Sequence, residues 1–286
     1  MKIKNITKIF LEEFIYGGHL LSLGGAGIVW SVIILLDVSF SWQILLISYL
    51  IPQIIYTYNH FKESKEDILT NPERADYLQK KIRKFPYIIS FYLLILFLVI
   101  SFFANINIFF FVFLLVIGGL LYTVYFKKLT EKLLCFKNIY VSLFWALIIS
   151  VPFLYYSLSF NSFFVLFFFF VFLRWIVNSI FFDIKDIKDD KGKKLKTLPA
   201  IIGKKKTLQF LHIVNFISFA PIFIGAYFKI LPFFSLSLII FYFYSYWYLM
   251  TTKEVEDKKI RLLSYIMVDG EYIFWPIVLI ISKILI

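Results

Sequence analysis

The sequence predicts an all-α polytopic membrane protein, and three features of the chain lead to that prediction. Hydrophobic residues make up 61% of the 286 positions, and Phe alone accounts for 37 of them. Apolar stretches of about 20 residues, the length that a helix needs to cross a bilayer, recur along the whole chain. These stretches are apolar on every side, whereas the strands of a membrane β-barrel alternate apolar and polar residues over about 10 positions.

We expect nine transmembrane helices around a central cavity that opens to the cytoplasm. Their approximate ranges are 17–36, 38–57, 85–104, 106–126, 138–157, 160–182, 207–227, 231–250 and 262–285. Residues 17–137 and 138–261 share one plan, in which two spans, an acidic and basic loop, two more spans and a shorter basic loop follow each other. We interpret them as pseudo-repeated four-helix units of a single domain, 1–286, that the ninth helix, 262–285, completes.

The basic residues predict the orientation of the chain. Of the 30 Lys and Arg residues, 27 lie in the alternate segments 1–16, 58–84, 127–137, 183–206 and 251–261. By the positive-inside rule this side is cytoplasmic, which puts the N-terminus inside and the C-terminus outside. The net charge of +12 follows from this bias and suits contact with the anionic headgroups of the lipid bilayer, so nucleic-acid binding is not expected.

Residues 1–16 are expected to form an amphipathic helix along the cytoplasmic interface. Its apolar positions at helical spacing are Ile3, Ile6, Phe10 and Phe14. Glu12 and Glu13 interrupt the segment and no small-residue cleavage site follows it, so it is not a secretory signal.

Two acidic clusters each follow directly on an apolar run and are surrounded by lysines. The first consists of Asn59, Glu63 and Asp67. On a helix that advances about 100° per residue, these positions fall within about 80° of one another and share a face. Hard oxygen ligands of this kind suit Mg²⁺, which binds a few carboxylates together with substrate phosphate oxygens. The alternative is a solvated helix whose carboxylates pair with neighbouring lysines.

The second cluster consists of Asp183, Asp186 and Asp190, with Asp189 on a different face. On a helix the three positions fall within about 60° of one another. Closely spaced aspartates repel one another unless cations compensate, and metal does this better than the intervening lysines. Because both clusters lie at one membrane face among cations, the sequence predicts a site that holds divalent metal and a polyanion together.

Polar groups inside the predicted spans mark further candidates, because such groups usually face the bundle interior or a water-filled cavity. Arg174 and Asn178 lie in the sixth span and Asp269 in the ninth. Arg174 is interpreted either as a substrate contact or as a structural partner of Asp269 or of a backbone carbonyl. We expect Asp269 to face the cavity.

The segments after the acidic clusters and after the fourth span supply basic and aromatic candidates. Arg74 is a candidate phosphate clamp, because a guanidinium binds oxyanions bidentately. Tyr122 and Tyr125 would line a pocket or, alternatively, belong to the aromatic belt at the membrane surface. Lys127 is a candidate phosphate contact.

The spacing Asn59-x-x-x-Glu63-x-x-x-Asp67 and the spacing Asp183-x-x-Asp186-x-x-x-Asp190 resemble the two aspartate-rich motifs of the UbiA superfamily of intramembrane prenyltransferases. Further matches in the family's order are the Tyr122-to-Lys127 segment, Lys137-Asn138, Asn178, Lys196-Thr197-Leu198-Pro199 followed by Gly203, and Asp269-Gly270. The chain departs from the family at His60 and Glu63, where aspartate is usual. Glutamate still binds Mg²⁺, so metal binding survives the change.

The resemblance implies an enzyme of the cell membrane that transfers an isoprenyl group from an allylic polyprenyl diphosphate to a small acceptor and releases diphosphate. It implies two Mg²⁺ ions held by Asn59, Glu63, Asp67, Asp183, Asp186 and Asp190. The implied catalytic residues are Asp67, Asp183, Asp186, Arg74 and Lys127. The expected substrate-binding residues are Asn59, Arg74, Tyr122, Tyr125, Lys127, Lys137, Arg174, Asn178, Lys196 and Asp269. An aromatic chamber would exclude water and stabilise the allylic carbocation through ring faces.

The acceptor and the reaction class leave alternatives open. A quinone-precursor aromatic, a glycerophosphate lipid precursor and a porphyrin-type ring all fit as acceptors. A terpene cyclase of the same fold would need no acceptor, because its prenyl chain attacks itself. A membrane transporter is a further alternative, although carriers usually bind their substrates near the bilayer midplane, whereas the acidic clusters lie at one face.

Overall fold

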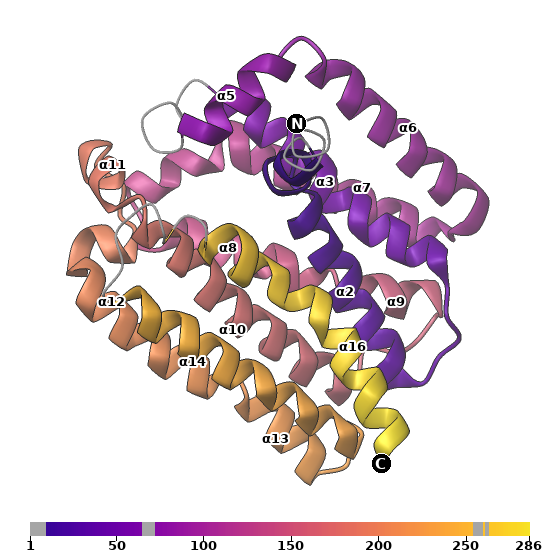
Figure 1. Ribbon diagram of the computed structural model, residues 1–286. Helices are drawn as coiled ribbons and strands as arrows, with labels where there is room; N and C mark the ends of the chain where they lie inside the picture. The colour runs from indigo at the N-terminus through magenta and orange to yellow at the C-terminus, as the bar shows by residue number, and fades with distance from the viewer. Residues whose placement is uncertain (1–9, 65–71, 254–259, 261–262) are drawn as a thin grey trace, which may run out of the picture.

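A computed structural model describes residues 10–64, 72–253, 260 and 263–286, and these residues form a bundle of helices without strands (Figure 1). The first half contains α2 (His19–Leu36), α3 (Trp42–Glu63), α5 (Pro72–Lys81), α6 (Phe85–Phe103), α7 (Ile106–Val124), η1 (Phe126–Glu131), α8 (Phe136–Leu147) and α9 (Ser150–Tyr155). The second half contains α10 (Ser162–Ile184), α11 (Ile187–Gly192), α12 (Leu198–Ile217), α13 (Ala220–Tyr227), η2 (Phe233–Ile239), α14 (Ile240–Thr252), η3 (Ser264–Val268) and α16 (Asp269–Leu285).

Eight helical segments in the described residues are long and apolar enough to cross a membrane. They are α2, α6, α7, α8 with α9, α10, α12 with α13, η2 with α14, and η3 with α16. The all-helical membrane class is therefore confirmed. The remaining predicted span, 38–57, lies in α3, which has 22 residues but carries Gln43, Pro52 and Gln53 and is less apolar. Of the predicted interfacial helix, residues 10–16 are helical and 1–9 lie outside the described residues.

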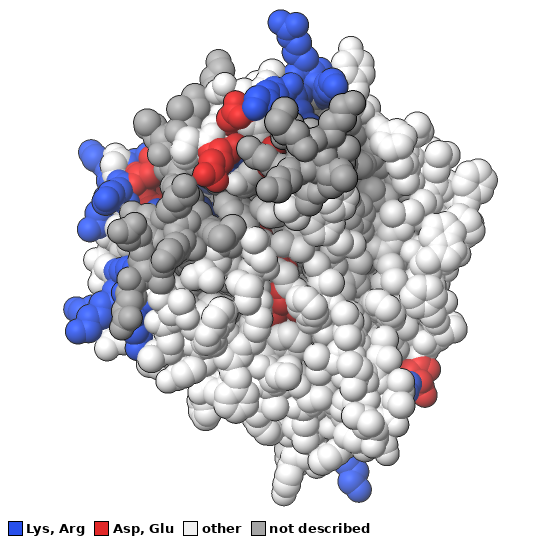
Figure 2. Space-filling view, viewed as in Figure 1, with Lys and Arg blue, Asp and Glu red and all other residues white. Residues whose placement is uncertain are grey.

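The charged residues gather at one end of the bundle. The short helices α5 and α11 lie at this end (Figure 1). Figure 2 shows most of the visible Lys and Arg over this region, above a broad surface that is almost free of charge. Near the opposite end, Lys283 pairs with Asp37. The bundle thus has one densely charged end, which we call the charged end and which α5, η1 and α11 form.

Glycines let three central helices approach one another closely. A Cβ atom added to Gly25 of α2 would lie 2.6 Å from the carbonyl oxygen of Ser48 in α3. A Cβ atom on Gly27 would overlap the carbonyl oxygen of Tyr272 in α16. Figure 1 shows α2 alongside α16 over much of its length. The glycine face of α2 therefore fixes the packing of α3 and α16 against it.

Two helices have irregular turns near the charged end. Gly203 interrupts α12 with φ of 79°, a left-handed conformation that glycine adopts without steric cost. The π-helical turn η3 directly precedes α16. Such single π turns occur frequently at functional sites, and this one ends immediately before Asp269.

A buried ion pair joins four helices in the apolar interior. Arg174 of α10 and Glu271 of α16 are each only 1% exposed, and an Nη2 to Oε2 distance of 2.6 Å separates them. The Arg174 guanidinium also donates to Asn215 of α12 and to Ser245 of α14. The structure therefore pairs Arg174 with Glu271, whereas the sequence had suggested Asp269 or a backbone carbonyl as its structural partner.

Removing one charge of this pair should destabilise the protein much more than removing both. We expect Arg174→Met to lower the free energy of unfolding by about 3–5 kcal/mol, because Glu271 is left buried without its cation. The double variant Arg174→Met/Glu271→Leu should recover more than half of that loss. Thermal unfolding in detergent measures both effects, and a double variant less stable than the single one would contradict the interpretation.

Candidate functional site

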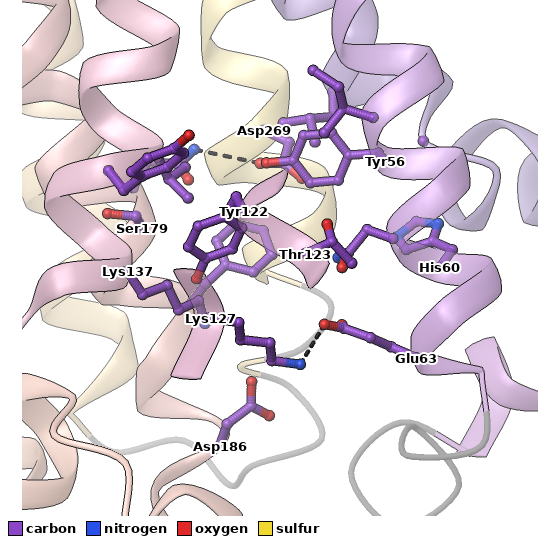
Figure 3. A pocket seen from close by; sticks show the side chains of 18 of the residues that line it. Tyr56, His60, Glu63, Tyr122, Thr123, Lys127, Lys137, Ser179, Asp186 and Asp269 are labelled. Carbon is purple, nitrogen blue, oxygen red and sulfur yellow. Dashed lines mark hydrogen bonds and ion pairs between the residues drawn. The ribbon is translucent and has the colours of Figure 1, made fainter. Parts of the chain in front are cut away.

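In the described part of the chain, a pocket of about 280 Å³ gathers most of the predicted site residues. Its lining comes mainly from α3, α7, α8 and α10, together with parts of the charged end. Figure 3 shows Glu63, Lys127 and Asp186 together at one side of the view and Tyr56 with Asp269 at the other. The pocket therefore combines a charged outer half with an aromatic inner half.

The first acidic cluster approaches the pocket from the last turns of α3. The Oδ1 atom of Asn59 is buried and has no hydrogen-bond partner among the described residues. Glu63 pairs with Lys127 of η1 across the pocket mouth (Figure 3). Arg74 lines the same region from α5, with its guanidinium 5.9 Å from the centre of the Tyr265 ring. Asp67 lies outside the described residues.

The second acidic cluster does not lie on one continuous helix, so the expected shared helical face is wrong in detail. Helix α10 ends at Ile184, and Asp186 directly precedes the separate short helix α11 without a side-chain capping hydrogen bond. Asp190 lies within α11 and accepts a 2.8 Å hydrogen bond from the hydroxyl of Thr197. The turn between the helices still brings Asp186 and Asp190 to the pocket lining.

The three aspartates of the second cluster have different partners. Asp183 is fully buried and accepts hydrogen bonds from Lys137, at 2.6 Å, and from Asn138, at 2.8 Å. Asp186 binds Lys185 through Oδ2 at 2.6 Å, while its Oδ1 atom is buried without a hydrogen-bond partner in the described chain. One oxygen of Asp186 is therefore available to a ligand.

Burial and charge repulsion perturb Asp190. Desolvation by burial, and next the neighbouring charge of Asp183, raise the pKa of its carboxyl to about 6. The Lys137 cation and the hydrogen bond from Thr197 oppose this shift in part. An additional cation near Asp190 would therefore stabilise the ionised form of its carboxyl group.

Most of the predicted site residues line the pocket. Those that do are Asn59, Glu63, Arg74, Tyr122, Lys127, Lys137, Asn178, Asp186, Asp190 and Asp269. They come from both halves of the sequence, as the pseudo-repeat of two acidic loops led us to expect. The fold therefore brings the two acidic clusters to one cavity.

Four predicted site residues lie in the described chain but not in the pocket lining. Asp183 lies behind Lys137, which it binds. Tyr125 is 64% exposed on the outside of the bundle. The Nζ atom of Lys196 donates to the carbonyl oxygen of Lys132 at 2.9 Å. The guanidinium of Arg174 is engaged by Glu271, Asn215 and Ser245.

Apart from Tyr122, the sequence analysis did not identify the residues of the aromatic inner half of the pocket. Tyr56, Tyr140, Trp145 and Trp175 line it from α3, α8 and α10. The indole N–H of Trp145 donates to the hydroxyl of Tyr56. In an apolar run these residues have the same pattern as ordinary core residues, so no sequence signal separated them. His60, one of the two departures from the family pattern, also lines the pocket.

The donor set of the pocket suits a hard cation. Among the described residues, no group of three or more His, Cys, Asp and Glu side chains is arranged to hold a metal ion, and Asp67 lies outside those residues. The unpartnered buried oxygens of Asn59 and Asp186, however, are amide and carboxylate donors of the kind that Mg²⁺ prefers. With Glu63 and Asp190 beside them, these residues fit Mg²⁺.

Comparison with known proteins identifies the family. The sequence model of the UbiA prenyltransferase family matches residues 19–268. The chain belongs to this family. With its long apolar helices, this UbiA protein is an integral membrane protein. No curated protein sequence matches it.

Solved structures share the UbiA fold at low sequence identity. A UbiA homologue from Aeropyrum pernix K1 is 15% identical with a TM-score of 0.67, and the match covers 93% of this chain and 97% of that one. A UbiA homologue from Archaeoglobus fulgidus bound to GPP and Mg²⁺ is 15% identical with a TM-score of 0.64, covering 94% and 99%. A digeranylgeranylglyceryl phosphate synthase is 15% identical with a TM-score of 0.59, covering 96% and 100%.

Asp190 should make the stability of the metal-free protein depend on pH. Its pKa is raised from 3.8 to about 6 on folding, so its stabilising contribution is complete below pH 3.8 and is lost as the pH rises through about 6. Asp190→Asn cannot ionise, so its melting temperature minus that of the wild type should grow between pH 4 and pH 7 in the presence of EDTA. Thr197→Val keeps the carboxylate and should retain the pH dependence. A constant difference for Asp190→Asn would contradict the raised pKa.

Proposed function

We propose that this protein is a Mg²⁺-dependent intramembrane prenyltransferase that moves an isoprenyl group from an allylic diphosphate to a small acceptor. The observation that carries the proposal is the division of one pocket between unpartnered oxygens among lysines and a buried aromatic half. An isoprenyl diphosphate has the same division, because an anionic head is joined to an apolar tail. Neighbouring structures of the same fold bind GPP or DMAPP with Mg²⁺, which supports this substrate class.

The charged half would hold the metal and the diphosphate. Two Mg²⁺ ions would be held by the two acidic clusters, with Asn59, Glu63, Asp186 and Asp190 in the pocket, Asp183 behind it and Asp67 outside the described residues. Bound Mg²⁺ would neutralise the charge that develops on the leaving diphosphate. Arg74, Lys127 and Lys137 line this half and would contact the phosphate oxygens.

Three lysines at the pocket pair with carboxylates of the acidic clusters, and a bound metal cation would take the place of these lysines. Lys127 pairs with Glu63, Lys137 with Asp183 and Lys185 with Asp186. When a cation binds these carboxylates, the ammonium groups would turn to an anionic diphosphate at the same place. The carboxylates and lysines thus have partners of opposite charge both with and without substrate. This keeps the free-energy cost of burying their charges at the membrane boundary low.

The aromatic half would protect the allylic carbocation. Tyr56, Tyr122, Trp145 and Trp175 line it, and the ring faces of tyrosines such as Tyr56 and Tyr122 attract cations. Exclusion of water by these rings favours transfer to an acceptor over hydrolysis. We propose that Asn178 and Asp269, which also line the pocket, bind the substrate or the acceptor there. The acceptor class is either a quinone-precursor aromatic or a glycerophosphate lipid precursor.

Product analysis tests the reaction. Purified protein with Mg²⁺, an allylic diphosphate and a panel of acceptors should release diphosphate and form a prenylated product detectable by mass spectrometry. Product without any acceptor would indicate a terpene cyclase instead. Solute uptake by proteoliposomes in the absence of diphosphate release would indicate a transporter.

Asp186→Asn should lower turnover by at least about 100-fold. Mutation of a residue that only supports a metal ligand costs up to about 100-fold, and Asp186 is proposed to bind the metal directly. The matched control is Asp76→Asn, which changes an exposed carboxylate on α5 that pairs with Lys80 and does not line the pocket. Both variants are compared by diphosphate release across a range of Mg²⁺ concentrations. Wild-type turnover in Asp186→Asn would remove this aspartate from the metal site.

We further propose that the charged end faces the cytoplasm. In a Cys135→Ser background, which removes the single cysteine of the chain, a membrane-impermeant maleimide should label Asp37→Cys on intact cells. Lys80→Cys, at the opposite end of the bundle and also exposed, should be labelled only after permeabilisation. The reverse labelling pattern would contradict the orientation.

A further inference from the structure

Three parallel aromatic rings close the inner end of the pocket. The rings of Trp145 and Trp175 stack with centroids 3.9 Å apart and planes inclined by 5°. Tyr272 continues the stack on the other face of Trp175, at 4.7 Å and 7°. Each of the three residues is 1% exposed. We call these rings, contributed by α8, α10 and α16, the aromatic floor.

The interior beyond the aromatic floor is filled by further rings. Trp275 lies 5.0 Å from Tyr272 and 4.9 Å from Phe170, measured between ring centroids. Trp275 and Phe170 are both fully buried. Within the described residues, the pocket lining includes Trp145 and Trp175 but neither of these two. Toward Trp275 and Phe170, the pocket therefore ends at the aromatic floor.

Close helix packing closes the side of the floor next to α2. A Cβ atom on Gly25 would lie 3.3 Å from the ring of Trp145, and one on Gly24 would lie 3.4 Å from the Cβ atom of Tyr272. The backbone of α2 therefore packs directly against the edges of the floor. Because Tyr56 accepts a hydrogen bond from Trp145, the ring is also held on the side of α3.

The depth of the pocket follows from the positions of the floor residues along their helices. Trp145 lies eight residues after Lys137, and Trp175 lies eight residues before Asp183. Eight residues of α-helix correspond to a rise of about 12 Å. Lys137 and Asp183 are bonded to each other, so both helices give the same depth from the charged half to the floor.

We propose that the aromatic floor limits the substrate to short allylic diphosphates, with a tail of about ten carbons as the longest that fits a depth of about 12 Å. The inference rests on the proposed function and adds the size of the isoprenyl group to it. Trp145 and Trp175 are then the residues that determine chain length.

Binding of non-reactive analogues tests the floor without an acceptor. We would measure the Kd values of dimethylallyl, geranyl and geranylgeranyl S-thiolodiphosphates for the protein in lipid nanodiscs with Mg²⁺. The wild type should bind the geranyl analogue at least tenfold more tightly than the geranylgeranyl analogue. Trp175→Ala and the milder Trp175→Leu should reduce this ratio at least tenfold by admitting the longer tail.

Trp247→Ala provides the matched control, because Trp247 of α14 is 52% exposed on the outer surface and lies outside the pocket. This variant should keep the wild-type ratio. Equal binding of the two tails by the wild type would overturn the floor, as would an unchanged ratio in a folded Trp175→Leu variant. Failure of all three analogues to bind with Mg²⁺ would instead overturn the proposed function, together with the inference that rests on it.

Discussion

The cost of placing charge inside an apolar bundle governs the arrangement of this protein. Apart from Asp269, the buried charges in the described residues occur in two settings, each with partners. Arg174 and Glu271 bind each other deep in the bundle and are further saturated by Asn215 and Ser245. The acidic residues of the pocket lie at its edge, where lysines reach them from η1 and α8. Helix positions are thereby set by polar contacts that the surrounding lipid cannot replace.

This constraint also explains why the pocket has two halves. Oxygens that bind cations are concentrated where α3 and α10 end, because water and lysines are available there. Farther inside, aromatic and aliphatic side chains make up most of the pocket lining, and Asn178 and Asp269 are among its polar residues. The two halves of the pocket match the charged head and apolar tail of the proposed substrate.

The sequence predicted the helical class, the family and the pairing of the acidic clusters, because hydropathy and motif spacing are local features of the chain. It did not predict the break between Ile184 and Asp186, since three aspartates at helical spacing occur equally well across a tight turn. It also missed Glu271 as the partner of Arg174, because these residues are 97 positions apart. The chain has many aromatic residues, and the roles of Trp145 and Trp175 depend on the fact that these two meet at the pocket. The periodicity of apolar residues in the sequence does not indicate which aromatic residues meet.

Asp269 and Glu271 lie two positions apart on α16, so at about 100° per residue they point in nearly opposite directions. One lines the pocket and the other binds Arg174 on the far side of the helix. The buried ion pair thus fixes the rotational setting of α16, which begins directly after the π-helical turn η3. The direction in which Asp269 faces is consequently set by a contact outside the cavity, so a change in the ion pair would reach the pocket through the rotation of α16.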